Sequence, residues 1–252
     1  MRKAVKNCRN LNMQTIRLRR SRPSSLSVAL ALAITMFVVW LISLQSCPRQ
    51  AAAAASSMRS TAEIPMESMD AQFLLSSMHD DKTQANVAAA LCAQNGGAGI
   101  VLTEGDQFAV VQEAGHDFAG SEAPVIRRSA RGLTLKTEGS ADTISALSDG
   151  LSALRALAEE TGSLAASLQN NTADANTVCA LLSVYKTQLE DASAALAPED
   201  DPAAALIRAS MEQSILRLAS AMENPTPGEI RLIHAKGCLE WIDLSNRLCN
   251  LA

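Results

Sequence analysis

Acidic residues are missing from the first 62 positions of the chain. All 26 Asp and Glu lie at or after Glu63, whereas 10 of the 22 Lys and Arg precede it. Residues 1–62 therefore carry a charge of +10 and residues 63–252 a charge of −14. Aromatic residues are also scarce, at 3% of the chain. An acidic body repels phosphate, and few aromatic side chains are present to stack on bases, so the composition predicts no nucleic-acid partner.

Charge is also absent from residues 24–46, and Leu26–Leu44 is almost continuously apolar. A helix of that length spans about 29 Å, close to the roughly 30 Å of a bilayer core. The basic segment before it predicts a cytoplasmic N-terminus and an extracytoplasmic body, as in a single-pass protein of the cell membrane. A cleaved signal peptide is an alternative because Ala51–Ala55 offers small residues, although signal cores are shorter, about 7–15 residues. Lipidation of Cys47 is another alternative, since Leu44–Cys47 loosely resembles a bacterial lipoprotein box.

Sequence motifs for metal binding and catalysis are missing as well. His79, His116 and His234 are far apart, and none belongs to an H-x-x-x-H or H-E-x-x-H arrangement. The chain has no nucleophile elbow, phosphate-binding glycine loop or dinucleotide fingerprint. We therefore predict no metal, no cofactor, no catalytic residue and no enzymatic activity. An envelope hydrolase is a competing hypothesis for which no nucleophile or carboxylate pair stands out.

The six cysteines contain no C-x-x-C pair, which removes the usual thiol-redox motif. Cys92, Cys179, Cys238 and Cys249 fall in the acidic body. Cys238 and Cys249 would be about 16 Å apart along one helix, too far for a disulfide. A disulfide from either of them to Cys179 and buried free thiols both remain open.

Composition divides the chain into five segments. A stretch of Ala, Ser and Pro without a sustained apolar period predicts a tether. Short β-type runs around one helix follow the tether, and the rest of the chain is predicted to be helical. The predicted segments are a basic cytoplasmic arm at 1–24, a transmembrane anchor at 25–46, a linker at 47–68, an α+β module at 69–138 and a four-helix region at 139–252.

Short apolar runs and turn residues predict the elements of the α+β module. Val87, Ala88 and Leu91 give its helix one packing face. Residues 113–131 contain glycines and a proline without a helical period and predict a loop. The expected elements are strands at 71–76, 100–102, 107–111 and 133–136 and a helix near 83–93.

Helix-capping residues punctuate the C-terminal part of the chain. Ser140, Thr172, Asp201 and Thr226 each precede a stretch with helical apolar spacing. Thr226 and Glu229 form a capping box. Four amphipathic helices with short connections predict an antiparallel bundle.

Residues 69–115 resemble a SPOR domain, the peptidoglycan-binding module of bacterial division and sporulation proteins. The similar features are Gln72 in the first strand, small and apolar helix residues such as Ala85 and Leu91, the glycine-rich joint at 96–99 and the strand at 107–110. The order of basic arm, membrane helix and tether is also similar to that family. The resemblance extends to about residue 138 and implies a small ferredoxin-like β-α-β-β-β module.

The chain departs from the family pattern at two places. Ser76–Met78 stand where the first strand usually ends in Gly and Phe, and the family's second helix is missing from residues 113–131. The family binds glycan on the sheet face that helices leave open. Here the implied candidates are Gln72, Phe108, Val110 and Gln112, the last three of which share a face by alternation. Packing of Phe108 and Val110 in the core is the alternative.

The resemblance and the topology together imply a membrane-anchored protein of the cell envelope. Its expected partner is peptidoglycan, bound through the SPOR-like module during division or sporulation. The alternative is a scaffold that binds other envelope proteins through its bundle and has a degenerate module without glycan binding. The sequence leaves the oligomeric state open.

Overall fold

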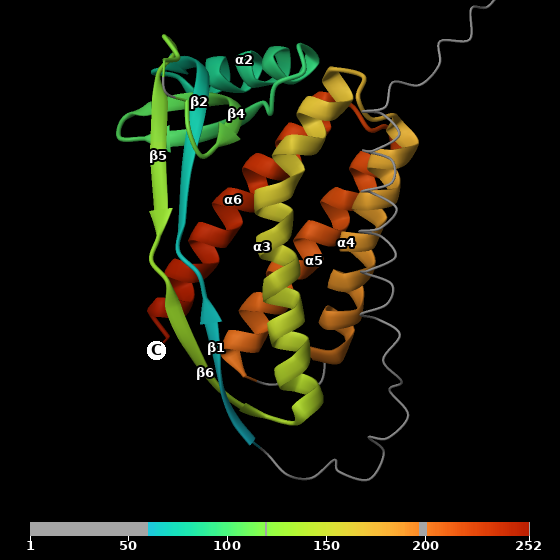
Figure 1. The fold of residues 1–252 in the computed structure, drawn as a ribbon. Helices are drawn as coiled ribbons and strands as arrows, with labels where there is room; N and C mark the ends of the chain where they lie inside the picture. Colours follow the sequence, from blue (N-terminus) through green and yellow to red (C-terminus); the bar gives the residue numbers. More distant parts are fainter. Residues whose placement is uncertain (1–59, 119, 197–200, 252) are drawn as a thin grey trace, which may run out of the picture. The chain divides into compact units, whose positions relative to one another are not determined.

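A computed structural model describes residues 60–118, 120–196 and 201–251 (Figure 1). They belong to one compact unit of the chain, Ala55–Ala252. In order, the described elements are β1 Ser60–Met66, β2 Met69–His79, α2 Lys82–Gln94, β3 Ile100–Glu104, β4 Gln107–Gly115, β5 Val125–Ala130, β6 Leu133–Gly139, α3 Ala141–Gln169, α4 Ala175–Leu196, α5 Pro202–Glu223 and α6 Pro227–Cys249.

The six strands pair antiparallel in two sheets. A four-stranded sheet has the order β3-β4-β2-β5, and β1 pairs with β6 in a two-stranded sheet. The register of β2 on β4 shifts between Leu74 and Ser77, which marks bulges that bend a strand. Arg128 on β5 forms an ion pair with Glu104 at the end of β3. The two outer strands of the larger sheet are therefore linked by a salt bridge.

Side-chain caps fix the starts of the bundle helices. Ser140, Asp201 and Thr226 accept backbone N–H groups at the starts of α3, α5 and α6, which confirms these predicted caps. Such bonds satisfy N–H groups that lack a partner in the first helical turn. The prediction of Thr172 as a cap was wrong: Asp174 Oδ1 accepts the N–H of Thr177 at 2.7 Å, and α4 starts after it.

One apolar core continues from the larger sheet into the bundle. Phe73 on β2, Leu147 on α3, Leu189 on α4 and Ile230 on α6 are all fully buried in it. Helix α6 contacts β2, β4 and β5 as well as α3 and α5, so it joins the sheet to the other helices (Figure 1). A Cβ placed at Gly237 would meet the Cα of Ala158 at 3.2 Å, so glycine lets α6 approach α3 closely.

The predicted fold class was wrong. It combined a transmembrane helix, a ferredoxin-like β-α-β-β-β module and a separate bundle, whereas the structure is α+β with five described helices and two antiparallel sheets. Strand β1 lies where part of the linker at 47–68 was expected, and β5 lies in the expected loop. The larger sheet packs against α6 of the bundle instead of a second helix of its own.

Across residues 60–118, 120–196 and 201–251, none of the helices combines the length and apolar character that crossing a bilayer requires. The transmembrane helix predicted at 25–46 lies outside these residues, as do the basic arm and the site at Cys47.

The packing face predicted for the first helix was also wrong. Helix α2 buries Ala85 and Ala89 against Val110 of β4. Its larger apolar residues Val87 and Leu91 are 60% and 54% exposed. Small residues therefore face the sheet, and large apolar residues face solvent.

Candidate functional site

Two pairs of polar residues lie side by side on β2 and β5. Asp70 is opposite Ser129, and Gln72 is opposite Arg127. Directly opposed residues of antiparallel strands project to the same face, and residues two apart along a strand share a face. The four side chains therefore lie on one face of the sheet. An open pocket of about 390 Å³ covers this region and is lined by Asp70, Ala71, Gln72, Arg127, Arg128 and Ser129.

Phe118 adds an aromatic ring to this face. Its backbone N–H donates to Gln72 Oε1 at 3.3 Å. A Cβ placed at Gly115 would lie 3.1 Å from the Phe118 ring, so the ring covers the glycine. Gly115 is opposite Gln72 in the β2–β4 pairing, and its missing side chain would project to the same face. The Phe118 ring over Gly115 of β4, the Gln72 amide on β2 and the Arg127 guanidinium on β5 thus form one row across the sheet.

The polar groups of this β2–β5 face are available to a ligand. Asp70, Arg127 and Ser129 are exposed. Within the described residues, no hydrogen bond or ion pair occupies the Asp70 carboxylate, the Arg127 guanidinium or the Ser129 hydroxyl. A carboxylate accepts from hydroxyls, a guanidinium donates to them, and an amide or hydroxyl can do both. With an adjacent aromatic ring, this set matches a ligand that carries hydroxyl groups on an apolar ring skeleton.

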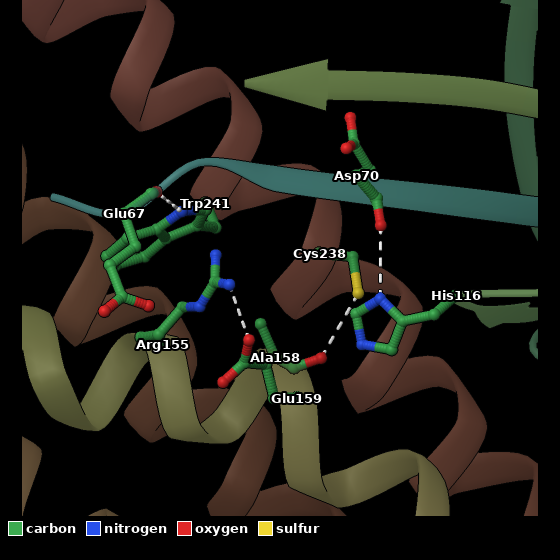
Figure 2. A network of polar contacts seen from close by, with 8 residues as sticks. All are labelled: Glu67, Asp70, His116, Arg155, Ala158, Glu159, Cys238 and Trp241. Atoms are coloured by element: carbon green, nitrogen blue, oxygen red, sulfur yellow. Dashed lines mark hydrogen bonds and ion pairs between the residues drawn. The ribbon is translucent and has the colours of Figure 1, made fainter. Parts of the chain in front are cut away.

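A network behind the face holds the start of β2 against the bundle (Figure 2). Trp241 Nε1 on α6 donates to the carbonyl of Glu67 at 3.3 Å. His116 Nδ1 lies 3.2 Å from the carbonyl of Asp70, and Figure 2 shows the Asp70 carboxylate on the other side of the strand. The backbone that carries the open side chains is therefore fixed from behind, which pre-organises a binding surface.

The same network fixes α3 to α6. The Arg155 guanidinium lies 5.4 Å from the centre of the Trp241 ring and pairs with Glu159 at 2.5 Å. The thiol of Cys238 donates to the carbonyl of Ala158 at 3.3 Å. These contacts span the closest approach of the two helices.

Two buried titratable groups on α6 are one helical turn apart. Burial raises the pKa of the Cys238 thiol to about 12, so at neutral pH it is a protonated, unreactive thiol. Burial, and to a smaller extent the positive charge of His116, lowers the pKa of His234 to about 4. The structure thus brings together two of the three histidines that are far apart in sequence.

The described part of the chain contains neither a disulfide nor a cluster of side chains suited to a metal ion. Cys92, Cys179, Cys238 and Cys249 are free thiols, so none of the disulfides left open by the sequence is formed. No cluster of three His, Cys, Asp or Glu side chains suited to a metal ion occurs among the described residues.

The structure separates the four residues proposed from the sequence. Gln72 lies on the open β2–β5 face. Val110 is fully buried beneath α2, and Phe108 is half-buried in the same cluster. Gln112 is exposed, and its carbonyl accepts the N–H of Ala98 at 2.7 Å. The candidates therefore do not form one surface, because α2 covers the end of the sheet where Phe108 and Val110 lie.

Sequence reasoning missed Asp70, Phe118, Arg127 and Ser129. Arg127 and Ser129 were missed because β5 follows Pro124 in a segment that was assigned to a loop. Val125 and Ile126 are the available strand signal, and a proline just before an outer strand is a common position for that residue. Phe118 gave no signal, because the packing of its ring on Gly115 depends on the tertiary structure.

Comparisons of the chain with protein-family models, with curated proteins and with solved structures found no significant match.

Proposed function

We propose that this protein is a membrane-anchored component of the cell envelope that binds peptidoglycan glycan strands on its β2–β5 face. The carrying observation is the open row of the Phe118 ring, the Gln72 amide and the Arg127 guanidinium beside the Asp70–Ser129 pair. The anchor and the extracytoplasmic location are inferred from the apolar run at 26–44 and the basic residues before it.

A polysaccharide of low charge density fits the charge of the molecule better than a densely charged anionic polymer does. Residues 63–252 carry −14, which repels polyanions at long range. The face itself carries one carboxylate, from Asp70, and one guanidinium, from Arg127. Sugar hydroxyls and N-acetyl groups can bond to both of these and to the amide, while the ring of Phe118 contacts the apolar side of a sugar.

Weak contacts suffice at such a site. An anchored protein is confined close to the polymer that it binds, and confinement raises the effective concentration of each partner. A few hydrogen bonds and one aromatic contact per molecule can then hold many anchored copies to the glycan network.

Substitutions on the β2–β5 face are expected to reduce glycan binding without unfolding the protein. Arg127→Ala and Gln72→Ala each remove hydrogen bonds to the ligand, and we expect each to lower the association constant for purified sacculi about tenfold. The measurement is co-sedimentation of the fragment 55–252, the compact unit with its own core, with intact sacculi and with sacculi stripped of stem peptides. Gln112→Ala, which changes an exposed amide that does not line the pocket, is the matched control.

Retention on stripped sacculi assigns the ligand to the glycan. Retention on intact sacculi alone would assign it to the stem peptides and contradict a glycan ligand. No retention of the wild-type fragment on either material would refute the proposed function.

A protein scaffold without glycan binding is the second candidate. The observation that favours it is the exposure of Val87 and Leu91 on α2, because large apolar side chains in solvent commonly mark protein interfaces. Protein crosslinks in the envelope together with no sedimentation on sacculi would favour this candidate.

A further inference from the structure

Strand β5 is an outer strand of the larger sheet, and one of its edges has no partner strand among the described residues. It pairs with β2 alone, from Val125 to Ala130 (Figure 1). Helix α6 also contacts β5, and Ile126 and Ala130 belong to the core that the sheet shares with the bundle. These contacts use a face of β5. The edge that points away from β2 carries no strand in the described structure.

The register of β5 on β2 shows which backbone groups lie on this open edge. In an antiparallel pair, hydrogen-bonded and non-hydrogen-bonded residue pairs alternate. The N–H of Leu75 donates to the carbonyl of Pro124 at 3.0 Å, so every second pair from there is hydrogen-bonded. Arg127 and Ser129 fall between those positions, and their N–H and C=O groups point away from β2. Neither N–H has an acceptor among the described residues.

Backbone groups in this pattern match one kind of partner. The outward groups repeat every second residue, about 6.6 Å apart, which is the repeat of a neighbouring β-strand. An extended peptide that adds to a sheet edge supplies carbonyls and N–H groups at that spacing. A helix does not, because its own backbone groups are bonded internally. The open edge therefore fits an extended segment of polypeptide.

The side chains of this region favour an acidic segment. Residues 123–135 contain three arginines and no acidic residue, in a body whose net charge is −14. Arg128 pairs with Glu104, whereas Arg127 and Arg131 are exposed and have no ion pair within the described residues. A carboxylate opposite an arginine on the neighbouring strand stabilises the pairing, and the guanidinium can bind it through two N–H groups.

A second copy of the chain fits the same edge less well. Two β5 strands side by side bring the arginines of both copies together, and like charges on adjacent strands destabilise a sheet. The two acidic bodies also repel each other. A short acidic segment meets less of this repulsion, because salt screens charges that are more than about 8 Å away at physiological ionic strength.

We propose that the open edge of β5 binds an extended acidic segment of another protein as an added strand. Backbone carbonyls of the segment accept the N–H groups of Arg127 and Ser129, and its carboxylates pair with Arg127 and Arg131. The edge is short, so the complex is weak and reversible. This inference does not depend on glycan binding, which uses side chains of the adjacent sheet face and shares the Arg127 guanidinium with the proposed edge site.

Substitution of Ser129 tests the backbone contact. The probe is a fluorescein-labelled peptide in which Glu alternates with Thr and Val, and fluorescence anisotropy with the full 252-residue chain in mild detergent gives the association constant. Ser129→Pro removes an outward N–H but no hydrogen bond to β2, a position at which a sheet edge tolerates proline. It is expected to lower the association constant at least about fivefold. Ser129→Ala removes the same hydroxyl but keeps the N–H, and this matched control is expected to bind as wild type does.

Charge reversal at Arg127 tests the choice of an acidic partner and leaves the backbone unchanged. Arg127→Glu is expected to lower the association constant for the Glu peptide about tenfold and to raise it for the same peptide with Lys in place of Glu. An unchanged unfolding temperature shows that each variant is folded. If the proline variant unfolds, the result for Arg127→Glu decides.

Absence of Glu-peptide binding to the wild-type protein would overturn the proposal. Wild-type binding by Ser129→Pro, equal losses in the proline and alanine variants, or a wild-type preference for the Lys peptide would do so too. Sedimentation of both Ser129 variants with sacculi separates this site from the glycan site. A sugar contact to the hydroxyl responds to both substitutions alike, whereas strand addition responds to proline alone.

Discussion

Acidification from pH 7 to pH 4 is expected to reduce the free energy of unfolding by about 3 kcal/mol through His234 alone. The pKa of this histidine falls from 6.5 to about 4 on folding, chiefly because the imidazole is buried. Each unit of pKa difference corresponds to about 1.4 kcal/mol. Above pH 6.5 the ring is neutral in both states. Between pH 6.5 and 4 the unfolded chain binds a proton that the folded protein excludes, so stability is lost over this window.

The surroundings of His234 explain why its ring stays neutral. The residue is 5% exposed, and a Cβ placed at Gly162 on α3 would meet its ring at 2.6 Å. The packing is too tight for solvation of a charged ring. The positive charge of His116 acts in the same direction, whereas contacts with the backbone of Ala158 and Ala114 favour the proton and offset part of the effect.

Urea unfolding of fragment 55–252 at pH 7, 5.5 and 4 measures the effect. His234→Gln removes the titrating group. The loss in free energy of unfolding between pH 7 and pH 4 is expected to be about 3 kcal/mol smaller in this variant than in wild type. His79→Gln, which changes a half-exposed histidine on β2, is the control and should retain the full decline. An equal decline in wild type and His234→Gln would show that His234 is not the group that titrates.

The helix caps that were predicted correctly depend only on residues close together in the sequence. Ser140, Asp201 and Thr226 were identified as caps because a cap needs one side chain and the next three residues. Thr172 failed because the turn before α4 offers a second acceptor, Asp174, two residues later. Propensity cannot decide between two capping residues that lie this close together in the sequence.

Features set by tertiary contacts were not predictable. Strand β1 consists of Ser60–Met66, which has only a short apolar alternation at Ala62, Ile64 and Met66, and β6 pairs with it along its whole length. The apolar spacing of α2 indicated a packing face at Val87, Ala88 and Leu91, which is not the side that packs on the sheet. The sheet covers the alanine side, so Val87 and Leu91 remain exposed.

The candidate site was recoverable in part. Gln72 was identified through the resemblance, whereas Arg127 and Phe118 required the pairing of β5 and the packing of a ring on Gly115. A binding face assembled from three separate segments has no single spacing in the sequence. Its residues become neighbours only through strand register.

Trp241→Ala is expected to be the most destabilising single change in the molecule that we consider, with a loss of about 4 kcal/mol. Trp241 is 3% exposed in the core between α6, α3 and the β1–β2 turn. Removal of the indole leaves a cavity and removes the hydrogen bond to the Glu67 carbonyl. It also removes the ring beneath Arg155, whose Nε and Nη1 are buried without a hydrogen-bond partner among the described residues. A buried guanidinium that loses its aromatic contact adds to the cost of the cavity.

Trp241→Phe separates the packing contribution from the hydrogen bond. Phenylalanine keeps an aromatic ring under Arg155 and most of the buried volume but cannot donate to Glu67, so we expect a loss of about 1–2 kcal/mol. Urea unfolding of fragment 55–252 at pH 7 gives both values under one condition. Equal losses for the two variants would mean that the N–H bond, and not the buried ring, dominates. Losses below about 1 kcal/mol for both would contradict the role of Trp241 in joining β2 to α3 and α6. We expect the alanine variant to be far less stable than the phenylalanine variant, because a cavity and the loss of the ring beneath Arg155 together cost more than one hydrogen bond.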